Sequence, residues 1–277
     1  MGLRINTNEH AIAAQRNLEQ TGRRMDSVFQ RLSSGSRINK VSDDPAGLSI
    51  SDALNAQVRS LGQGIRNAQD GISLVQVYEG GTNEITNILV RMRELAMQSA
   101  TDTVGDKERR MIDSEVQQIK MEVDRIAKTT KYASRDLLSG DKIVLDFQVG
   151  TENRDNVDRI TFDPGDTNLT ASGINVDAIS VLDKEGAQSA LGDIDGALDK
   201  VNDIRSRIGA IQGRLNSTQI AQSIFQENLT AAKSRIRDAD IAQESANMAK
   251  ESILRQAGVA VLTQANESSK LALNLLR

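Results

Sequence analysis

Side chains that could perform acid–base or metal chemistry are scarce in this sequence of 277 residues, which holds one histidine and no cysteine. His10 has no second histidine with which to form a metal site, and one histidine among polar helix residues does not define a Ser-His-Asp triad. The absence of cysteine excludes disulfides, thiolate metal sites and cysteine nucleophiles. We therefore interpret His10 as a surface residue.

Paired acidic residues occur in two short segments, SDDPAG at 42–47 and RDADIA at 237–242. Carboxylates of this kind can bind Ca²⁺ or act as an acid and a base, but neither segment has the loop spacing of an EF-hand. Each segment lies beside an apolar stripe with helical spacing, where a carboxylate can accept hydrogen bonds from the first free N–H groups of a helix. The sequence thus predicts helix caps, formed by Asp43, Asp44, Asp238 and Asp240.

Glycine patterns do not indicate a nucleotide site. The segment LGQGIRN at 61–67 lacks the third glycine of a dinucleotide-binding turn and lies inside a helical stripe rather than after a strand. Gly209 and Gly213 are four residues apart, a spacing that permits close approach of two helices. The sequence therefore predicts no catalytic residue, no cofactor and no metal, and a protein that is not an enzyme.

Composition excludes further classes of protein and favours long helices. A net charge of −4 and a pI near 5.3 argue against a general nucleic-acid binder, which would need a basic face. No apolar run reaches the roughly 18 residues of a membrane span, and the first twenty residues hold no apolar core of a secretory signal, so these features alone predict a cytoplasmic protein. Only two prolines and six aromatic residues favour long helices over a compact enzyme.

Apolar periodicity supplies the elements. A heptad seam covers residues 11–32, a regular stripe runs from about 44 to 99, and further stripes cover 112–126, 194–236 and the segment that starts near 238. Alternation at 143–149 predicts a small hairpin within 140–177, expected as a cap at one end of the helices, and 165–190 is expected to be irregular. The fold class is mainly α: a long helical rod bundle with a small β-hairpin element.

Helices this long cannot cover their own apolar stripes in a thin rod. They need partners, and contacts between copies that do not close into a ring produce an open helical filament. The periodicity therefore points to self-association.

Three sequence blocks carry a family resemblance: RLSSGSRINKVSDDPAGLSIS at 31–51, ILVRMRELAMQSA at 88–100, and the C-terminal run at 229–266 with the ending LLR. With these blocks in this order, the chain resembles bacterial flagellin from end to end. Ser36 and Pro45 are small departures from the family pattern. The resemblance implies a structural subunit that polymerises into the flagellar filament, in a short form without large outer domains.

The resemblance also implies a division of the chain. Residues 1–42 with 236–277 would form a terminal coiled coil, the inner core of the filament, and residues 43–235 a helical rod that includes the β element at about 140–177. The ends would fold as they assemble. Polymerisation would bury these residues: Leu18, Met25, Leu32, Ile253, Val261, Leu275 and Leu276.

Partners follow from the same resemblance. They are other copies of the chain, the flagellar type III export apparatus, an export chaperone at the C-terminal helix, and the filament cap, with no nucleic acid and no membrane insertion. Export without a cleaved signal would place the protein outside the cell, against the cytoplasmic prediction. Arg91, Leu95 and Glu115 match the positions that contact neighbouring subunits and the vertebrate innate-immune flagellin receptor.

Two other functions remain open on the sequence. A hook–filament junction protein resembles flagellin at both ends, although the complete rod block and the QAGVAVLTQAN ending favour flagellin. An exported enzyme with flagellin-like ends is the third alternative, and it lacks both an inserted domain and catalytic residues.

Overall fold

Five helices dominate the computed structural model, which describes residues 8–140, 144–155, 157–163 and 167–274, the side chains from 268 onward excepted. The predicted long stripes are confirmed as helices. The bounds, in chain order, are α1 Glu9–Ser34, α2 Pro45–Ser99, α3 Asp106–Thr129, α4 Lys184–Arg237 and α5 Ile241–Asn274. Two short antiparallel pairs follow α3: β1 Lys131–Tyr132 with β2 Arg135–Asp136, and β3 Leu145–Gln148 with β4 Arg159–Phe162.

The expectation of irregular structure up to residue 190 was wrong, because α4 already begins at Lys184. Its first turns bury only alanines, Ala187 and Ala190, before the first large apolar residue, Ile194. A stripe that starts with such small side chains gives a weak periodic signal, although alanine is the best helix former.

The chain divides into two compact units, and the division falls within α2 and α4. One unit comprises residues 1–57 with 228–277 and the other comprises residues 58–227; we call them the terminal unit and the central unit. None of the helices among the described residues is long and apolar enough to cross a membrane.

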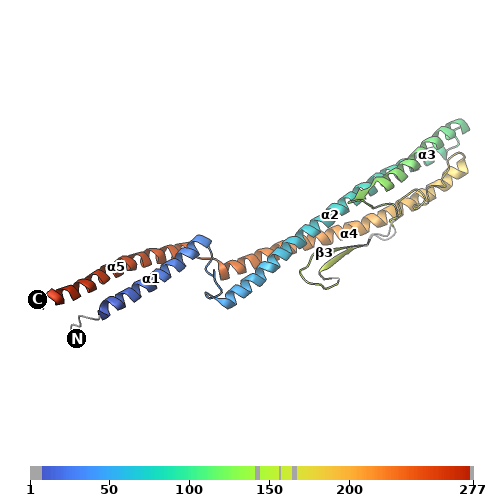
Figure 1. Cartoon of the computed structure of the whole chain (residues 1–277). Helices are drawn as coiled ribbons and strands as arrows, with labels where there is room; N and C mark the ends of the chain where they lie inside the picture. Colours follow the sequence, from blue (N-terminus) through green and yellow to red (C-terminus); the bar gives the residue numbers. More distant parts are fainter. Residues whose placement is uncertain (1–7, 141–143, 156, 164–166, 275–277) are drawn as a thin grey trace. The chain divides into compact units, whose positions relative to one another are not determined.

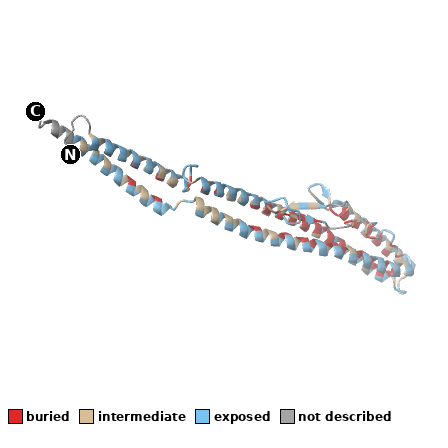
Figure 2. Ribbon diagram, turned by 90° about the horizontal axis from the view of Figure 1, so that it is seen from below, coloured by how far each residue is buried: buried red, intermediate tan, exposed pale blue. Residues whose placement is uncertain are grey.

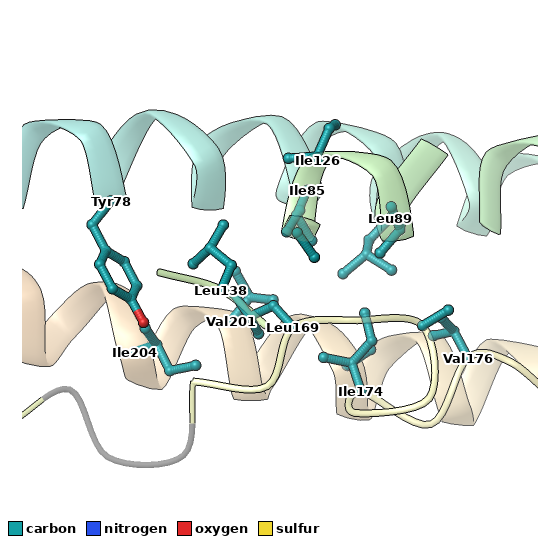
Figure 3. Packing of buried hydrophobic residues seen from close by; sticks show 14 of the residues in the cluster. Tyr78, Ile85, Leu89, Ile126, Leu138, Leu169, Ile174, Val176, Val201 and Ile204 are labelled. Atoms are coloured by element: carbon teal, nitrogen blue, oxygen red, sulfur yellow. The ribbon is translucent and has the colours of Figure 1, made fainter. Parts of the chain in front are cut away.

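The central unit has a continuous hydrophobic core. Helices α2, α3 and α4 lie side by side in it (Figure 1). Side chains from all three meet those of the segment that follows β2, whose described core residues lie between 137 and 181. Figure 3 shows Ile85 and Leu89 of α2 beside Leu169 of that segment and Val201 of α4. Leu89 and Val201 are completely buried, as expected of a stripe that repeats every three or four residues.

Polar side chains of α3 hold the segment 171–181, which has no regular structure of its own. Asp124 accepts a hydrogen bond from the Ala171 N–H at 2.7 Å, and Asp113 accepts one from the Val181 N–H at 3.0 Å. Between them, Lys120 donates to the carbonyl of Asp177 at 2.8 Å and to that of Ile179. Burial lowers the pKa of Lys120, although Asp113 and Asp177 partly oppose that effect.

The β3–β4 hairpin lies along α2 and α4 rather than over an end of the helices, so the predicted position as a terminal cap differs from the structure. Asn67 of α2 donates to the Gln148 carbonyl at 2.7 Å, and Gln222 of α4 donates to the carbonyl of Val149. Gly64 permits this approach, because a Cβ at that position would overlap the Val149 carbonyl. The hairpin thus covers helix surface that α3 does not reach.

The terminal unit has far less buried surface, as the colouring of Figure 2 shows. Among its described residues, the buried apolar side chains are Ala14, Val28 and Ile38 only. Helices α1 and α5 lie side by side (Figure 1), and their Cα atoms approach within 8 Å of each other. Two helices of this kind can bury one stripe each and leave the rest of their surface exposed.

Candidate self-association surface

The heptad seam of α1 faces α5, the helix with which the family resemblance implied that it pairs. Ala14, Thr21 and Val28 are buried, and the residues between them, Leu18 and Met25, are half-buried. Leu32 continues the same stripe and is half-buried as well. The predicted α1 residues therefore contact a helix of their own chain, and they hold α5 in place rather than forming an open surface.

The opposing stripe of α5 contains two buried glutamates, which the sequence did not predict. Glu244 and Glu251 are both buried against α1, and half-buried Met248, Gly258 and Leu262 continue the stripe. The Glu244 carboxylate lies 3.2 Å from an Arg31 nitrogen, and the Glu251 carboxylate lies 3.7 Å from an Arg24 nitrogen. The sequence carried one signal of this arrangement: each helix repeats its charged residue after seven positions.

The apolar stripe that the sequence predicted on α5 is exposed instead. Ile253 is 65% exposed and Val261 is 59% exposed. The alanines of that stripe share the exposure; they are Ala242, Ala246, Ala249, Ala257 and Ala260. Helical geometry puts Ile253 and these alanines on the side of α5 that faces away from Glu244 and Glu251, since each residue advances about 100° around the axis. Val261 lies at the edge of that side, about 80–100° around the axis from the two glutamates. We call this surface the outer face of α5. The predicted residues Leu275 and Leu276 lie outside the described part of the chain.

Both chain segments of the terminal unit break at one junction. Gly35 ends α1 with a φ of 67°, and its carbonyl accepts a hydrogen bond from the Ala239 N–H at 2.9 Å. The N–H of Arg37 donates to the Arg237 carbonyl at 2.6 Å, and Ser36 forms a β-bridge with Asp238. The junction therefore ties the end of α1 to the start of α5 through backbone bonds.

Helix capping was predicted for four acidic residues near this junction; it is confirmed for Asp44 and Asp240 and was wrong for Asp43 and Asp238. Asp44 accepts from the Gly47 N–H at 2.9 Å at the start of α2, and Asp240 accepts from the Ala242 N–H at 2.9 Å at the start of α5. Asp43 binds the loop N–H groups of Asn39 and Lys40 instead, and these bonds lower its pKa. Asp238 enters the junction through its backbone bridge.

No chemistry assembles elsewhere in the described part of the chain. His10 is exposed on α1, and no group of three or more His, Asp or Glu residues is placed to hold a metal ion among the described residues. The acidic pairs therefore serve the backbone rather than a reaction.

Arg91, Leu95 and Glu115 lie on neighbouring helices of the central unit. Arg91 donates to the Glu115 carboxylate at 2.9 Å and to Glu94 at 3.2 Å; these hydrogen bonds raise its pKa further. Leu95, by contrast, is only 3% exposed and belongs to the core. Arg91 and Glu115 are thus available to another molecule, whereas Leu95 supports the helix that carries Arg91.

Comparison with family models matches both ends of the chain. Residues 5–142 match the bacterial flagellin N-terminal helical region, and residues 191–276 match the bacterial flagellin C-terminal helical region. The chain is 40% identical to a flagellin of Halalkalibacterium halodurans over 273 residues, which cover 99% of each protein. It is 38% identical to the flagellar filament 33 kDa core protein of Treponema phagedenis, again over 99% of each.

Solved structures agree with these matches. The crystal structure of Bacillus cereus flagellin superposes with a TM-score of 0.50 at 27% identity and covers 57% of this chain and 88% of its own. A flagellar hook-associated protein of Vibrio parahaemolyticus gives 0.58 at 17% identity, over 71% of this chain and all of its own. At that identity the second likeness is one of fold alone, and it does not favour a hook–filament junction role.

Proposed function

This chain belongs to the bacterial flagellin family, and from that premise we propose that it polymerises through the outer face of α5. Its function is that of a structural subunit: it is exported to form the extracellular flagellar filament and is not an enzyme. The proposal concerns how this chain makes the contacts with its neighbours.

The exposure of Ile253 and Val261 carries the proposal. Burying a side chain of this size releases roughly 1.5–3 kcal/mol, and the contact recurs with every subunit that is added. The alanines beside them keep the surface flat enough for another helix to approach closely. A second copy of the chain is the partner that a homopolymer supplies at every position.

Leu18, Met25 and Leu32 support this surface indirectly. Their half-buried seam on α1 holds α5 in place, and α5 carries the outer face. Two helices that bury so little depend on further contacts for their order. We therefore expect α1 and α5 to complete their folding on assembly. Leu275 and Leu276 are assigned to the same contact on the family resemblance.

The division into an inner-core domain, 1–42 with 236–277, and a rod domain, 43–235, remains part of the proposal. Helix α1 ends at Ser34 and helix α4 ends at Arg237. The loop from α1 to α2 and the loop from α4 to α5 therefore lie near the proposed boundaries, which supports the division.

The remaining partners are proposed from the family. The exposed apolar residues of α5 suit an export chaperone and the type III export apparatus, which must handle this helix before it is covered, and the filament cap, which receives it. Arg91 and Glu115 suit a subunit contact or the innate-immune flagellin receptor, because both are exposed. Leu95 would act there by supporting α2.

Replacing Ile253 and Val261 with aspartate tests the proposed surface. Addition of the parent chain and the variant to short filament seeds, followed by electron microscopy and sedimentation, measures the concentration needed for elongation. That concentration should rise by about 100-fold or more, because charges replace two apolar side chains that the contact with another copy would bury. The matched control is Val41→Asp, at a position 66% exposed in the loop after α1. Elongation of I253D/V261D at the parent's concentration would refute the proposal.

A further inference from the structure

Helix α5 has two stripes. The one that meets α1 holds Glu244 and Glu251 beside Met248 and Leu262, and we call it the polar stripe after its two buried glutamates; the other stripe is apolar throughout. The stripe on α1 is apolar, with Ala14, Leu18 and Val28 among its members. Opposite it lie two glutamates, although α5 carries Ile253 on its other side. Hydrophobic burial alone would favour the opposite rotation, in which the apolar stripes of the two helices meet.

The arrangement also carries an electrostatic cost. A carboxylate that is removed from water must regain its solvation from a partner, and Glu251 has one buried oxygen without a hydrogen-bond partner among the described residues. Its ion pair with Arg24 is long, at 3.7 Å. The glutamates are buried, whereas the Arg24 side chain is 53% exposed and that of Arg31 is 31% exposed. Ion pairs with one buried partner add little net stability, and their best-attested role is to select one arrangement over another.

We propose that the pairs Arg24–Glu251 and Arg31–Glu244 fix the rotation of α5 about its own axis. They hold the polar stripe against α1 and thereby keep the outer face of α5 turned away from α1. Without them, α5 can turn and cover Ile253 with its own chain. The four residues are positioning residues for assembly: they prevent the subunit from burying its polymerisation surface internally.

The spacing of the pairs supports this role. Arg24 and Arg31 are seven residues apart, as are Glu244 and Glu251, so the two pairs repeat after one heptad along antiparallel helices. A half-turn of α5 separates both pairs at once. The backbone bonds of the junction fix the base of the helix pair, but they hold no side chain beyond residue 244. Farther along the helices, the Asn8 side chain donates to the Ala265 carbonyl at 2.9 Å, and the two ion pairs join charged side chains of α1 and α5. The ion pairs are side chain to side chain and therefore depend directly on which face of α5 meets α1.

Disulfide trapping in the full-length chain measures this rotation directly, because the chain has no cysteine of its own. Gly258 is adjacent to Leu18, since a Cβ at Gly258 would lie 3.3 Å from the Leu18 Cδ1 atom. The L18C/G258C pair therefore reports the rotation seen here. Ala260 lies roughly 200° further around the helix, so the L18C/A260C pair reports the turned state.

In the parent background, L18C/G258C should form the disulfide and L18C/A260C should not. In the R24Q/R31Q background, which leaves both buried glutamates without their charged partners, the ratio of the first disulfide to the second should fall at least about tenfold, the change that corresponds to ~1.4 kcal/mol. The matched control, Arg23→Gln, makes the same replacement at an exposed position of α1 and should leave the ratio unchanged.

An unchanged ratio in R24Q/R31Q would overturn the inference, and so would equal trapping of both pairs in the parent. The second part of the inference, that the turned state hides the polymerisation surface, rests on the proposed function. Elongation on seeds separates the two. A tenfold lower ratio with normal elongation refutes the proposed surface but not the rotational role, whereas an unchanged ratio with I253D/V261D inactive refutes only the rotational role.

Discussion

Leu89 in the central unit and Leu18 in the terminal unit occupy comparable places in regular apolar stripes, yet their surroundings differ. Leu89 is completely buried among residues of α2, α3, α4 and the segment after β2. Leu18 meets one helix and remains half-exposed. The same pattern therefore yields a finished core where three helices and a covering segment meet, and an unfinished one where only two helices meet.

The difference separates two tasks within one chain. The central unit buries its stripes internally, so its stability does not depend on other molecules. The terminal unit leaves Ile253 and Val261 uncovered, and in the proposed mode of assembly part of its stabilisation comes from other copies. A subunit built in this way can fold its central unit first and complete its ends in the filament.

Leu89→Ala should have the largest effect on the folding of the chain. Deleting a fully buried leucine side chain costs about 2–5 kcal/mol, whereas Leu18→Ala should cost at most about 1 kcal/mol because that side chain is already half in water. Urea unfolding of the full-length chain, followed by circular dichroism, measures both. Equal losses would contradict the contrast between the two units.

Lys120→Met should have a smaller effect, and it tests whether polar bonds complete the core of the central unit. The substitution leaves the carbonyls of Asp177 and Ile179 without their donor, which should cost about 1–3 kcal/mol in unfolding free energy. Lys128→Met is the control, since the Lys128 side chain is 67% exposed on the same helix. If the two variants have the same free energy of unfolding, the hydrogen bonds from Lys120 to segment 171–181 contribute little to stability.

The sequence predicted the helices well, because long stripes with regular spacing leave few alternatives. It also predicted the α1 seam and the capping by Asp44 and Asp240. It misplaced the hairpin, since alternation indicates a strand but not the surface against which the strand packs. The hydrogen bonds from Lys120 to segment 171–181 were not predicted, because they join residues almost sixty positions apart.

The rotation of α5 was the least predictable feature. Apolar spacing identified the stripe that contains Ile253, and the natural expectation is that an apolar stripe is buried within its own chain. Glu244 and Glu251 occupy the buried stripe instead, and only their pairing with arginines on α1 makes that possible. Periodicity alone does not distinguish an apolar stripe that is buried by another subunit from one that is buried within its own chain.

Hydrogen exchange of the full-length chain, measured before and after assembly on seeds, tests the central claim most directly. In the soluble chain, amides of α1 and α5 should exchange much faster than those around Leu89, and assembly should slow them by about 100-fold or more while the central unit changes little. If α1 and α5 are already as protected as the central unit in the soluble chain, the terminal unit is complete by itself and the account is wrong.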